Sequence, residues 1–167
     1  MKICIVTASE GKNLDLALKF IECLSAKEIE TALIDLVDLD LPLYTTKNEK
    51  RFDVQELLLP IKEKLIADGY VFIAPEYNGS TPPSLSNFFA WVSRSTKNWR
   101  ETFNSKAAAI ATHSAGGGLS VLTVMRLQLA YIGMNVIGRQ IHITPQKPLD
   151  EASLDVVCNQ LIRLAKL

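Results

Sequence analysis

The chain has little cysteine, no excess of charge of either sign and no long hydrophobic run. Its three cysteines, Cys4, Cys23 and Cys158, are odd in number and show no C-x-x-C or histidine-paired spacing. They therefore argue against a disulfide framework, a zinc site or thiol redox chemistry, and we expect them to be simple core thiols. Lysine plus arginine equals aspartate plus glutamate at 18 each, so no net positive field would attract nucleic acid or an anionic membrane surface.

No apolar run reaches about 18 residues, the length that a membrane-spanning helix needs. The sequence opens directly into a strand-like segment, MKICIVTAS, without the charged region, apolar stretch and cleavage site of a secretory signal. These absences predict no membrane partner and a cytoplasmic location.

Short apolar runs alternate along the chain with longer amphipathic stretches. Ile3 to Thr7 and Val71 to Pro75 are too brief for helices and are flanked by turn residues, as is typical of strands buried on both faces. The same reading predicts further strands at 31–35, 107–112 and 136–143, and helices at 14–26, 52–66, 84–93, 118–131 and from 149 onward. At 167 residues the chain fits one domain with a full hydrophobic core.

Alternating strands and helices predict an α/β fold, with a five-stranded parallel sheet inside a three-layer α/β/α sandwich that spans 1–167 as a single domain. Ligands of such sheets bind beyond the carboxyl ends of the strands, near the point where strand order reverses. The segments to inspect are therefore 8–13, 75–81 and 113–118, which follow the first, third and fourth strands.

The first of these loops offers groups that suit a phosphate. Ser9 and Asn13 can form hydrogen bonds, Lys12 supplies positive charge, and a helix start directs free N–H groups at an anion. An ordinary helix cap by Ser9 or Asn13 fits equally well. The loop matches neither G-x-G-x-x-G nor G-x-x-x-x-G-K-[ST], so the dinucleotide fingerprint and the NTPase loop are both unsupported.

The middle loop, Pro75 to Ser80, is the most informative stretch. Its proline, asparagine and glycine predict a tight turn with outward-facing backbone groups, and Tyr77 adds a planar face and a hydroxyl. A planar, hydrogen-bonding heterocycle would fit this loop. A plain strand-to-helix connection, with Ser84 as the helix cap, is the alternative.

The run PEYNGS, followed by proline, leucine, asparagine and tryptophan at positions 82, 85, 87 and 91, resembles the signature of the NADPH-dependent FMN reductase family. The loop 8–13 stands where that family has its flavin phosphate loop. The run Leu41-Pro42-Leu43-Tyr44 is similar to one that the family carries after its second strand. The resemblance covers nearly the whole chain and thins after about residue 120.

The resemblance implies a flavodoxin-like sheet of order 2-1-3-4-5 with FMN as the cofactor and NADPH, or NADH, as the electron donor. Ser9, Lys12 and Asn13 would hold the FMN phosphate. The isoalloxazine ring would be lined by Pro75, Glu76, Tyr77, Asn78, Gly79 and Ser80. The far edge of the ring and the ribityl chain would meet His113, Ser114, Gly116 and Gly117.

The resemblance further predicts an FMN-dependent NAD(P)H oxidoreductase, a flavoprotein that reduces flavin, quinone or azo-type acceptors by hydride transfer through FMN. The hydride chemistry would belong to FMN, so no catalytic side chain is expected. A small-molecule acceptor would be bound by Tyr77, Leu43, Tyr44 and a neighbouring subunit.

Two departures from the family pattern concern the turns. Ala8 replaces a glycine of the phosphate loop and Glu10 follows its serine, so a carboxylate beside the phosphate is expected to weaken FMN binding unless it turns to solvent. Pro83 stands where the family often has glycine, which stiffens the turn. A non-catalytic flavodoxin-like module with weakened FMN binding is therefore the main alternative.

A serine hydrolase that uses Ser114 is a second, weaker alternative. The segment around Ser114 runs from strand to turn to helix as a nucleophile elbow does, but Thr112 replaces the first glycine of G-x-S-x-G. No acid lies between Ala115 and Ile141 to precede His142, which we expect to be a structural histidine. An electron-transfer flavodoxin is also disfavoured, because such carriers are usually strongly acidic.

Helices 84–93 and 118–131 are unusually apolar. The first carries Phe88, Phe89, Trp91 and Val92, and the second is apolar on nearly every side. Members of the resembled family dimerise through these two helices. We therefore predict a homodimer, or a tetramer, built on them, with burial inside the monomer as the alternative.

Overall fold

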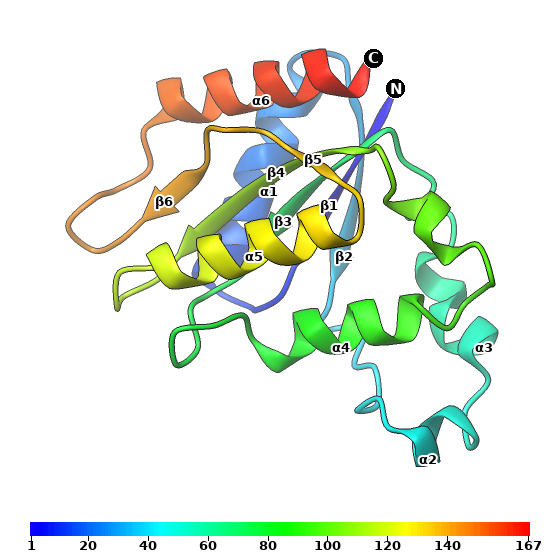
Figure 1. Ribbon diagram of the computed structural model, residues 1–167. Helices are drawn as coiled ribbons and strands as arrows, with labels where there is room; N and C mark the ends of the chain where they lie inside the picture. The colour runs from blue at the N-terminus through cyan, green and yellow to red at the C-terminus, as the bar shows by residue number, and fades with distance from the viewer.

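The computed structural model of the chain describes residues 1–167. One parallel sheet forms its centre, in the order β2-β1-β3-β4-β5, and β6 pairs with β4 beyond β5 (Figure 1). This confirms the predicted flavodoxin-like order. The strands are β1 (Lys2–Thr7), β2 (Glu30–Asp35), β3 (Gly69–Ile73), β4 (Ala107–His113), β5 (Asn135–Val136) and β6 (Ile141–Ile143).

Helices cover both faces of the sheet, which makes three layers. The elements outside the sheet are α1 (Lys12–Ser25), α2 (Thr46–Glu49), α3 (Val54–Leu58), η1 (Leu59–Ile61), α4 (Pro83–Val92), η2 (Trp99–Thr102), α5 (Leu119–Tyr131) and α6 (Glu151–Ala165). One core joins the sheet to α1 and α6, and the other joins it to α4 and α5. No helix is both long and apolar enough to cross a membrane.

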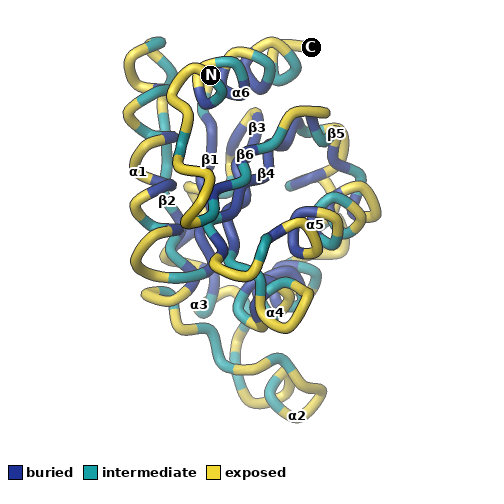
Figure 2. Tube along the Cα trace, turned by 90° about the vertical axis from the view of Figure 1, so that its left-hand side faces the viewer, coloured by how far each residue is buried: buried dark blue, intermediate teal, exposed yellow.

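Alternation along each strand supplies both cores at once. In β1, Ile3 and Ile5 face the α1–α6 core, whereas Cys4 and Val6 face the α4–α5 core, and all four are fully buried. Figure 2 shows the strands as a buried centre between more exposed helices. Continuous apolar strand sequences are therefore explained by burial on both faces.

The predicted helix at 52–66 is wrong in its length. Asp53 caps α3 by accepting the N–H of Gln55 at 2.8 Å, but the α-helix ends at Leu58 and continues only as the short 3-10 turn η1. Pro60 explains the break, because it has no N–H group to donate to the carbonyl four residues earlier and its ring crowds that turn.

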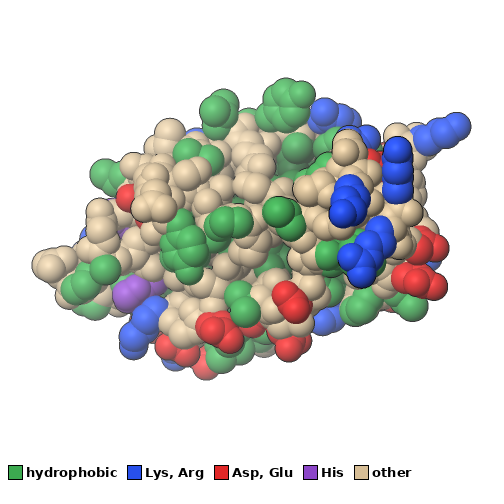
Figure 3. All heavy atoms as spheres, turned by 90° about the horizontal axis from the view of Figure 1, so that it is seen from below, with side chains coloured by type: hydrophobic (Ala, Val, Ile, Leu, Met, Phe, Trp, Pro, Cys, Tyr) green, Lys and Arg blue, Asp and Glu red, His purple; other side chains and the backbone are tan.

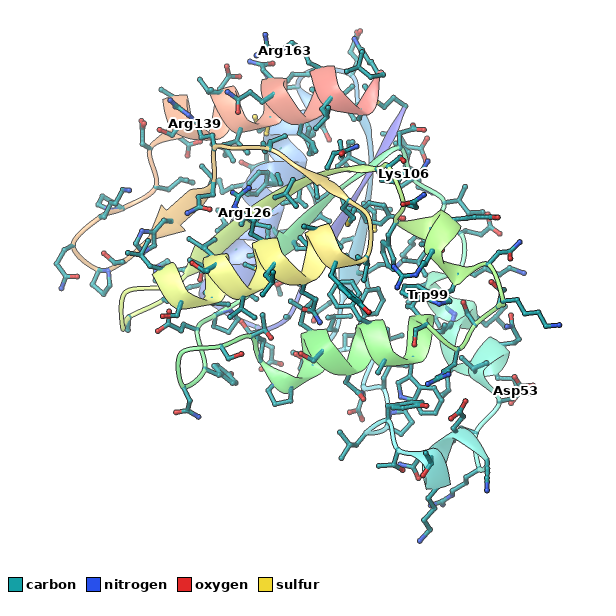
Figure 4. All side chains as sticks on the ribbon, viewed as in Figure 1. Asp53, Trp99, Lys106, Arg126, Arg139 and Arg163 are labelled. Atoms are coloured by element: carbon teal, nitrogen blue, oxygen red, sulfur yellow. The ribbon has the colours of Figure 1, made fainter.

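The predicted strand at 136–143 is divided into β5 and β6. Val136 pairs with Ala108 and Ile141 pairs with Ala111. The chain therefore advances five residues between these two pairs, whereas β4 advances only three. The extra residues loop out, and Arg126 of α5 donates to the carbonyls of 136, 137 and 138 and to the Gln140 side chain. Arg126 points from α5 towards this connection (Figure 4). A single guanidinium thus satisfies carbonyls that the broken ladder leaves free.

Candidate functional site

Three loops meet at the carboxyl ends of the adjacent strands β1, β3 and β4, at one end of the molecule (Figure 1). The sheet ladder extends into them, because the Ala8 N–H donates to Ile73 at 2.9 Å and the Ala74 N–H donates to Ala111 at 3.2 Å. The segments singled out from the sequence are therefore brought together by the fold.

The first loop leaves the N-terminus of α1 open. Gly11 occupies the cap position with φ 61°, and no side chain accepts a hydrogen bond from the first turn of the helix. Ser9 instead donates weakly to the Glu10 carbonyl at 3.4 Å, and Lys12 is exposed at the first helical position. The alternative of an ordinary cap by Ser9 or Asn13 is thus not what the structure shows. Free N–H groups, a helix dipole and one lysine remain here for an anion.

Asn13 fastens the first loop to the third. Its side-chain N–H donates to the His113 carbonyl at 3.1 Å, and its Oδ1 accepts the His113 N–H at 2.8 Å. The side chain is only 4% exposed. Both polar atoms of the Asn13 side chain are thus bonded to the backbone at the end of β4. The geometry therefore gives no support to a direct hydrogen bond from Asn13 to a phosphate.

The second loop is a tight two-residue hairpin. Tyr77 and Ser80 exchange two backbone hydrogen bonds, each 3.0 Å long, around Asn78 and Gly79, whose φ values are 51° and 76°. Two successive positive φ values define a type I′ turn, for which Asn-Gly is the favoured sequence. The turn uses up the N–H groups of Tyr77 and Ser80, so those of Asn78 and Gly79 remain for a ligand. The Tyr77 side chain stands 51% exposed beside them.

Glu76 and Ser114 bind the second loop to the third. The Glu76 N–H donates to Ser114 Oγ at 2.8 Å, and the Glu76 carboxylate accepts the N–H groups of Ser120 and Val121 at 3.1 and 3.4 Å. The carboxylate therefore closes the N-terminus of α5, where negative charge is favoured. Glu76 holds the loop in place from the side of α5.

The third loop depends on glycine. Gly117 and Gly118 have φ values of 116° and 79°, and a Cβ on Gly118 would lie 2.9 Å from Cγ2 of Thr112. The His142 imidazole contacts the Gly117 carbonyl, in agreement with the structural role expected for it. Gly116, like Gly117, has open space around its Cα, so a ligand can approach the backbone here.

The geometry around Ser114 does not support a serine nucleophile. Ser114 is 5% exposed, and its hydroxyl is shared between the Glu76 N–H and the Thr112 hydroxyl, which lies 2.8 Å away. His142 binds Gly117 and makes no hydrogen bond to Ser114. A nucleophile needs a base within hydrogen-bond reach, and Ser114 has none.

The remaining signature residues anchor the segment after β2. Asn87 of α4 accepts the Tyr44 N–H at 2.6 Å and donates to the carbonyls of Leu41 and Pro42, each at 3.1 Å. The Trp91 indole N–H donates to the same Pro42 carbonyl at 2.6 Å. These motif residues therefore hold the Leu41-Pro42-Leu43-Tyr44 run against α4.

Tyr44 and Tyr77 lie at opposite ends of α4. Tyr44 packs edge-on against Trp91 with ring centroids 5.2 Å apart and beneath Arg94, whereas Tyr77 lies in the loop that precedes the helix. The hydrogen bond from the Tyr44 hydroxyl to Glu49 raises the pKa of that tyrosine. Ten helical residues span about 15 Å, so one chain alone does not assemble the acceptor pocket expected from Tyr77, Leu43 and Tyr44.

Two further residues that sequence reasoning missed brace the loops. The Ser84 hydroxyl donates to the Ala8 carbonyl at 3.0 Å and thereby joins α4 to the first loop, so it is not the helix cap of the alternative interpretation. Thr112 is fully buried and supports Ser114. Ser84 stands inside the signature run, but no periodicity or spacing indicates its partner, which is 76 residues away.

A groove of about 330 Å³ opens beside the start of α1. Lys12 and Lys19 of α1, His113 of β4 and the segment 143–149 are among its walls. Glu10, the departure from the family pattern, is exposed and faces a separate hollow that includes Asp35, Asp38 and Asp40. The groove beside α1 therefore carries two lysines and one carboxylate, Asp15, whereas the hollow over the end of β2 carries four carboxylates and no basic side chain.

The apolar helices divide between core and surface. Phe88, Phe89, Trp91 and Val92 of α4 are at most 6% exposed, so they belong to the core of the monomer and the alternative of internal burial holds for them. On α5, Leu119, Leu127 and Tyr131 are 62%, 73% and 76% exposed. Figure 3 shows hydrophobic side chains spread over the middle of the lower face and lysine and arginine gathered at the end of α2 and α3.

The donor set of the three loops fits FMN. The uncapped start of α1 with Lys12 suits a phosphate, and the free N–H groups of Asn78 and Gly79 suit the polar edge of a flavin ring. Tyr77 offers an exposed aromatic face, and the glycines of the third loop leave room for a planar group.

Comparison with known proteins agrees with this fit. Residues 1–147 match the family described as NADPH-dependent FMN reductase. The chain is 30% identical over 138 residues to a quinone reductase of Escherichia coli (strain K12), covering 73% of this chain and 70% of that protein.

Solved structures share the fold at lower identity. The flavoenzyme NAD(P)H:(acceptor) oxidoreductase FerB from Paracoccus denitrificans superposes with a TM-score of 0.72 at 18% identity, covering 99% of this chain and 95% of that one. An oxidoreductase from Corynebacterium diphtheriae superposes with a TM-score of 0.71 at 17% identity, covering 99% and 96%. The match of sequence and the loop geometry lead to one assignment: the chain belongs to the NADPH-dependent FMN reductase family and is an oxidoreductase that uses FMN with NAD(P)H as donor.

Proposed function

We propose that this chain transfers hydride from NAD(P)H through FMN to a small-molecule acceptor, a quinone, a free flavin or an azo compound, and that residues 1–167 act as one FMN-binding domain. The observation that carries the proposal is the open N-terminus of α1, which lies beside two loops that are already braced. The similarity to a quinone reductase supports a quinone among the acceptors.

The phosphate end of the site would be formed by Lys12, Ser9 and the free N–H groups at the start of α1. Glu10 does not oppose this, because its side chain is exposed and lines the acidic hollow over β2. Asn13 would act indirectly, since it ties the helix start to His113.

The ring end would be formed by Pro75 to Ser80 and by His113, Ser114, Gly116 and Gly117. FMN, when bound, supplies the hydride chemistry, and the protein supplies orientation and electrostatics. Glu76 and Ser114 would orient the loop, Asn78 and Gly79 would donate N–H groups to the ring, and Tyr77 would flank the acceptor.

The test is the absorbance of protein that has been reconstituted with FMN and desalted. We expect flavin to remain bound, with a dissociation constant below about 100 μM, which corresponds to about 5.5 kcal/mol. Loss of all flavin, with no saturation in a titration up to that concentration, would overturn the proposal.

Anaerobic addition of NADPH then separates an enzyme from the non-catalytic module. Bleaching of the bound flavin, followed by recovery of its colour when a quinone is added, is the expected result. A flavin that stays oxidised would show a binding module without reductase activity. Parallel titrations with NADH and NADPH would show which donor is preferred.

We also propose that the protein is a homodimer that uses α5. Leu119, Leu127 and Tyr131 follow one another at helical spacing and leave a stripe of exposed apolar side chains. Sedimentation of the wild-type chain should give a dimer, or a tetramer, and Leu127→Glu should give a monomer. A wild-type monomer at micromolar concentration would contradict the proposal.

The cytoplasmic location of the protein stays a prediction.

A further inference from the structure

Two of the three cysteines meet between α1 and α6. Cys23 lies on α1, Cys158 lies on α6, and both pack in the same core, where burial and the neighbouring Cys23 thiol raise the pKa of Cys158. Both helices pack on the same face of the sheet and share one core (Figure 1). The sequence spacing gives no sign of this pair, because the two residues stand near opposite ends of the chain.

The contact between α1 and α6 also includes an ion pair near the two cysteines. Lys27 and Asp155 form an ion pair that spans α1 and α6, one turn away from each cysteine. Packed helices have axes about 8–10 Å apart, and their Cα atoms lie about 2.3 Å from each axis. Facing Cα atoms can therefore come within the roughly 4.4–6.8 Å that a disulfide requires.

The three thiols differ in access. Cys23 is half-buried, whereas Cys158 is fully buried behind it. Cys4 is fully buried in β1, faces the other core, and has its pKa raised to about 12 by burial. Cys23 is thus the thiol that a solute can reach, Cys158 is its neighbour, and Cys4 has no cysteine beside it.

We propose that Cys23 and Cys158 are a reversible redox pair, in which a hydroperoxide oxidises Cys23 and Cys158 then closes a disulfide between α1 and α6. In the first step the Cys23 thiolate attacks a peroxide oxygen, the O–O bond breaks, and Cys23 becomes a sulfenic acid while the peroxide is reduced to an alcohol or water.

In the second step the sulfur of Cys158 attacks the sulfur of Cys23. The S–O bond breaks, and the hydroxyl group leaves as water with the proton from Cys158. Two thiols and one hydroperoxide give one disulfide, one alcohol and one water, with two electrons transferred. A dithiol reductant reverses the bridge.

The bridge would act on the helix that begins at the phosphate loop. It would join the last turns of α1 to α6 across a long stretch of chain, which restricts the unfolded state strongly. Oxidation should therefore shift the thermal midpoint of the full chain upward, and reduction should restore the original midpoint.

The experiment is peptide mapping of the whole protein after treatment with hydrogen peroxide, with free thiols alkylated under denaturing conditions. We expect a Cys23–Cys158 cross-linked peptide that lacks two hydrogen atoms, full alkylation of Cys4, an unchanged oligomeric state, and reversal by dithiothreitol. Cys158→Ser should leave Cys23 as a sulfenic acid that dimedone captures, and Cys23→Ser should leave Cys158 reduced. If Cys158→Ser does not fold, the wild-type map decides. Unreacted thiols under peroxide that oxidises free glutathione, or disulfides between molecules, would overturn the proposal.

Discussion

Four helices, α1, α4, α5 and α6, begin at the carboxyl edge of the sheet, and their N-termini differ in how they are capped. Asp150, the residue just before α6, caps that helix by accepting hydrogen bonds from the N–H groups of Ala152 and Ser153 at 3.3 and 3.1 Å. Glu76 closes α5 from a distant loop. No side chain caps α1, whose N-cap position is Gly11. α4 also lacks a side-chain cap, but Pro83 at its first position has no N–H group to satisfy. α1 follows β1, at the centre of the sheet edge, where a capping side chain would compete with a bound phosphate.

The same contrast separates the two ends of the cofactor site. Hydrogen bonds of Glu76, Ser114 and Thr112 brace the ring loops before any ligand arrives, and the His142 ring supports the Gly117 carbonyl. The phosphate end has free N–H groups and one exposed lysine. Changes at the ring end should therefore affect stability as well as binding, whereas changes at the phosphate end should affect binding alone.

The largest expected effect comes from Gly118→Ala, at the start of α5. Its φ of 79° is strained for alanine, and the new Cβ would lie 2.9 Å from Thr112. We expect a loss of about 3 kcal/mol in the free energy of unfolding and a clear loss of FMN affinity. Urea unfolding and flavin titration measure both, and Gly138→Ala, where a Cβ would meet open space outside the site, is the matched control. Equal stability of the two variants would show that the third loop is not rigid.

Ser114→Ala should have a smaller effect at the same end. It removes the partner of the Glu76 N–H and should cost about 1–3 kcal/mol of stability, because a part-buried donor loses its acceptor. FMN and riboflavin should weaken by similar factors, since both carry the ring that this loop orients. Ser120→Ala removes a hydroxyl from the exposed first turn of α5 and serves as the control. A loss confined to FMN would place Ser114 at the phosphate instead.

Lys12→Ala tests the phosphate end of the site, at the uncapped N-terminus of α1. We expect the dissociation constant of FMN to rise about five- to tenfold, close to 1 kcal/mol, with no change in unfolding and little change for riboflavin. Salt should diminish the difference between wild type and variant, because exposed charges are screened. Lys47→Ala on α2 is the control. Equal weakening of FMN and riboflavin would show that Lys12 does not contact phosphate.

Whether a feature of the fold or the site could be predicted from the sequence depends on how far apart in the chain the interacting residues lie. The strand order, the loops at the sheet edge and the Asn-Gly turn depend on local residues and on a signature run, and the structure agrees with them. The contacts of Asn13 with His113 and of Ser84 with Ala8 join residues 100 and 76 positions apart, which no local pattern encodes.

The errors in secondary structure have the same cause. A helix was expected through Pro60 because the apolar spacing continues past it, and the split of the last strand depends on Arg126, a residue of a different element. The aromatic residues of α4 looked like an interface because their pattern cannot distinguish a partner subunit from the monomer's own core. In each case the deciding contact is tertiary.

Asp150→Asn gives the smallest expected effect. It tests α6, the helix whose N-terminus is capped by its own neighbouring residue, in contrast to the uncapped α1. Hydrogen bonds from Ser153 and Ala152 lower the pKa of Asp150 from its ordinary 3.8, so the ionised form stabilises the fold above the unfolded-state pKa. That contribution should disappear as the pH falls through the lower, folded-state pKa. Asparagine keeps the capping oxygen and removes the charge. Wild type should therefore unfold at a slightly higher urea concentration than the variant at about pH 7, and the two curves should converge below about pH 3. FMN affinity should be the same in both proteins, because α6 is already closed by its own residue. A variant that lost FMN would show that the N-terminus of α6 also serves the ligand, and the distinction between closed and open helix starts would fail.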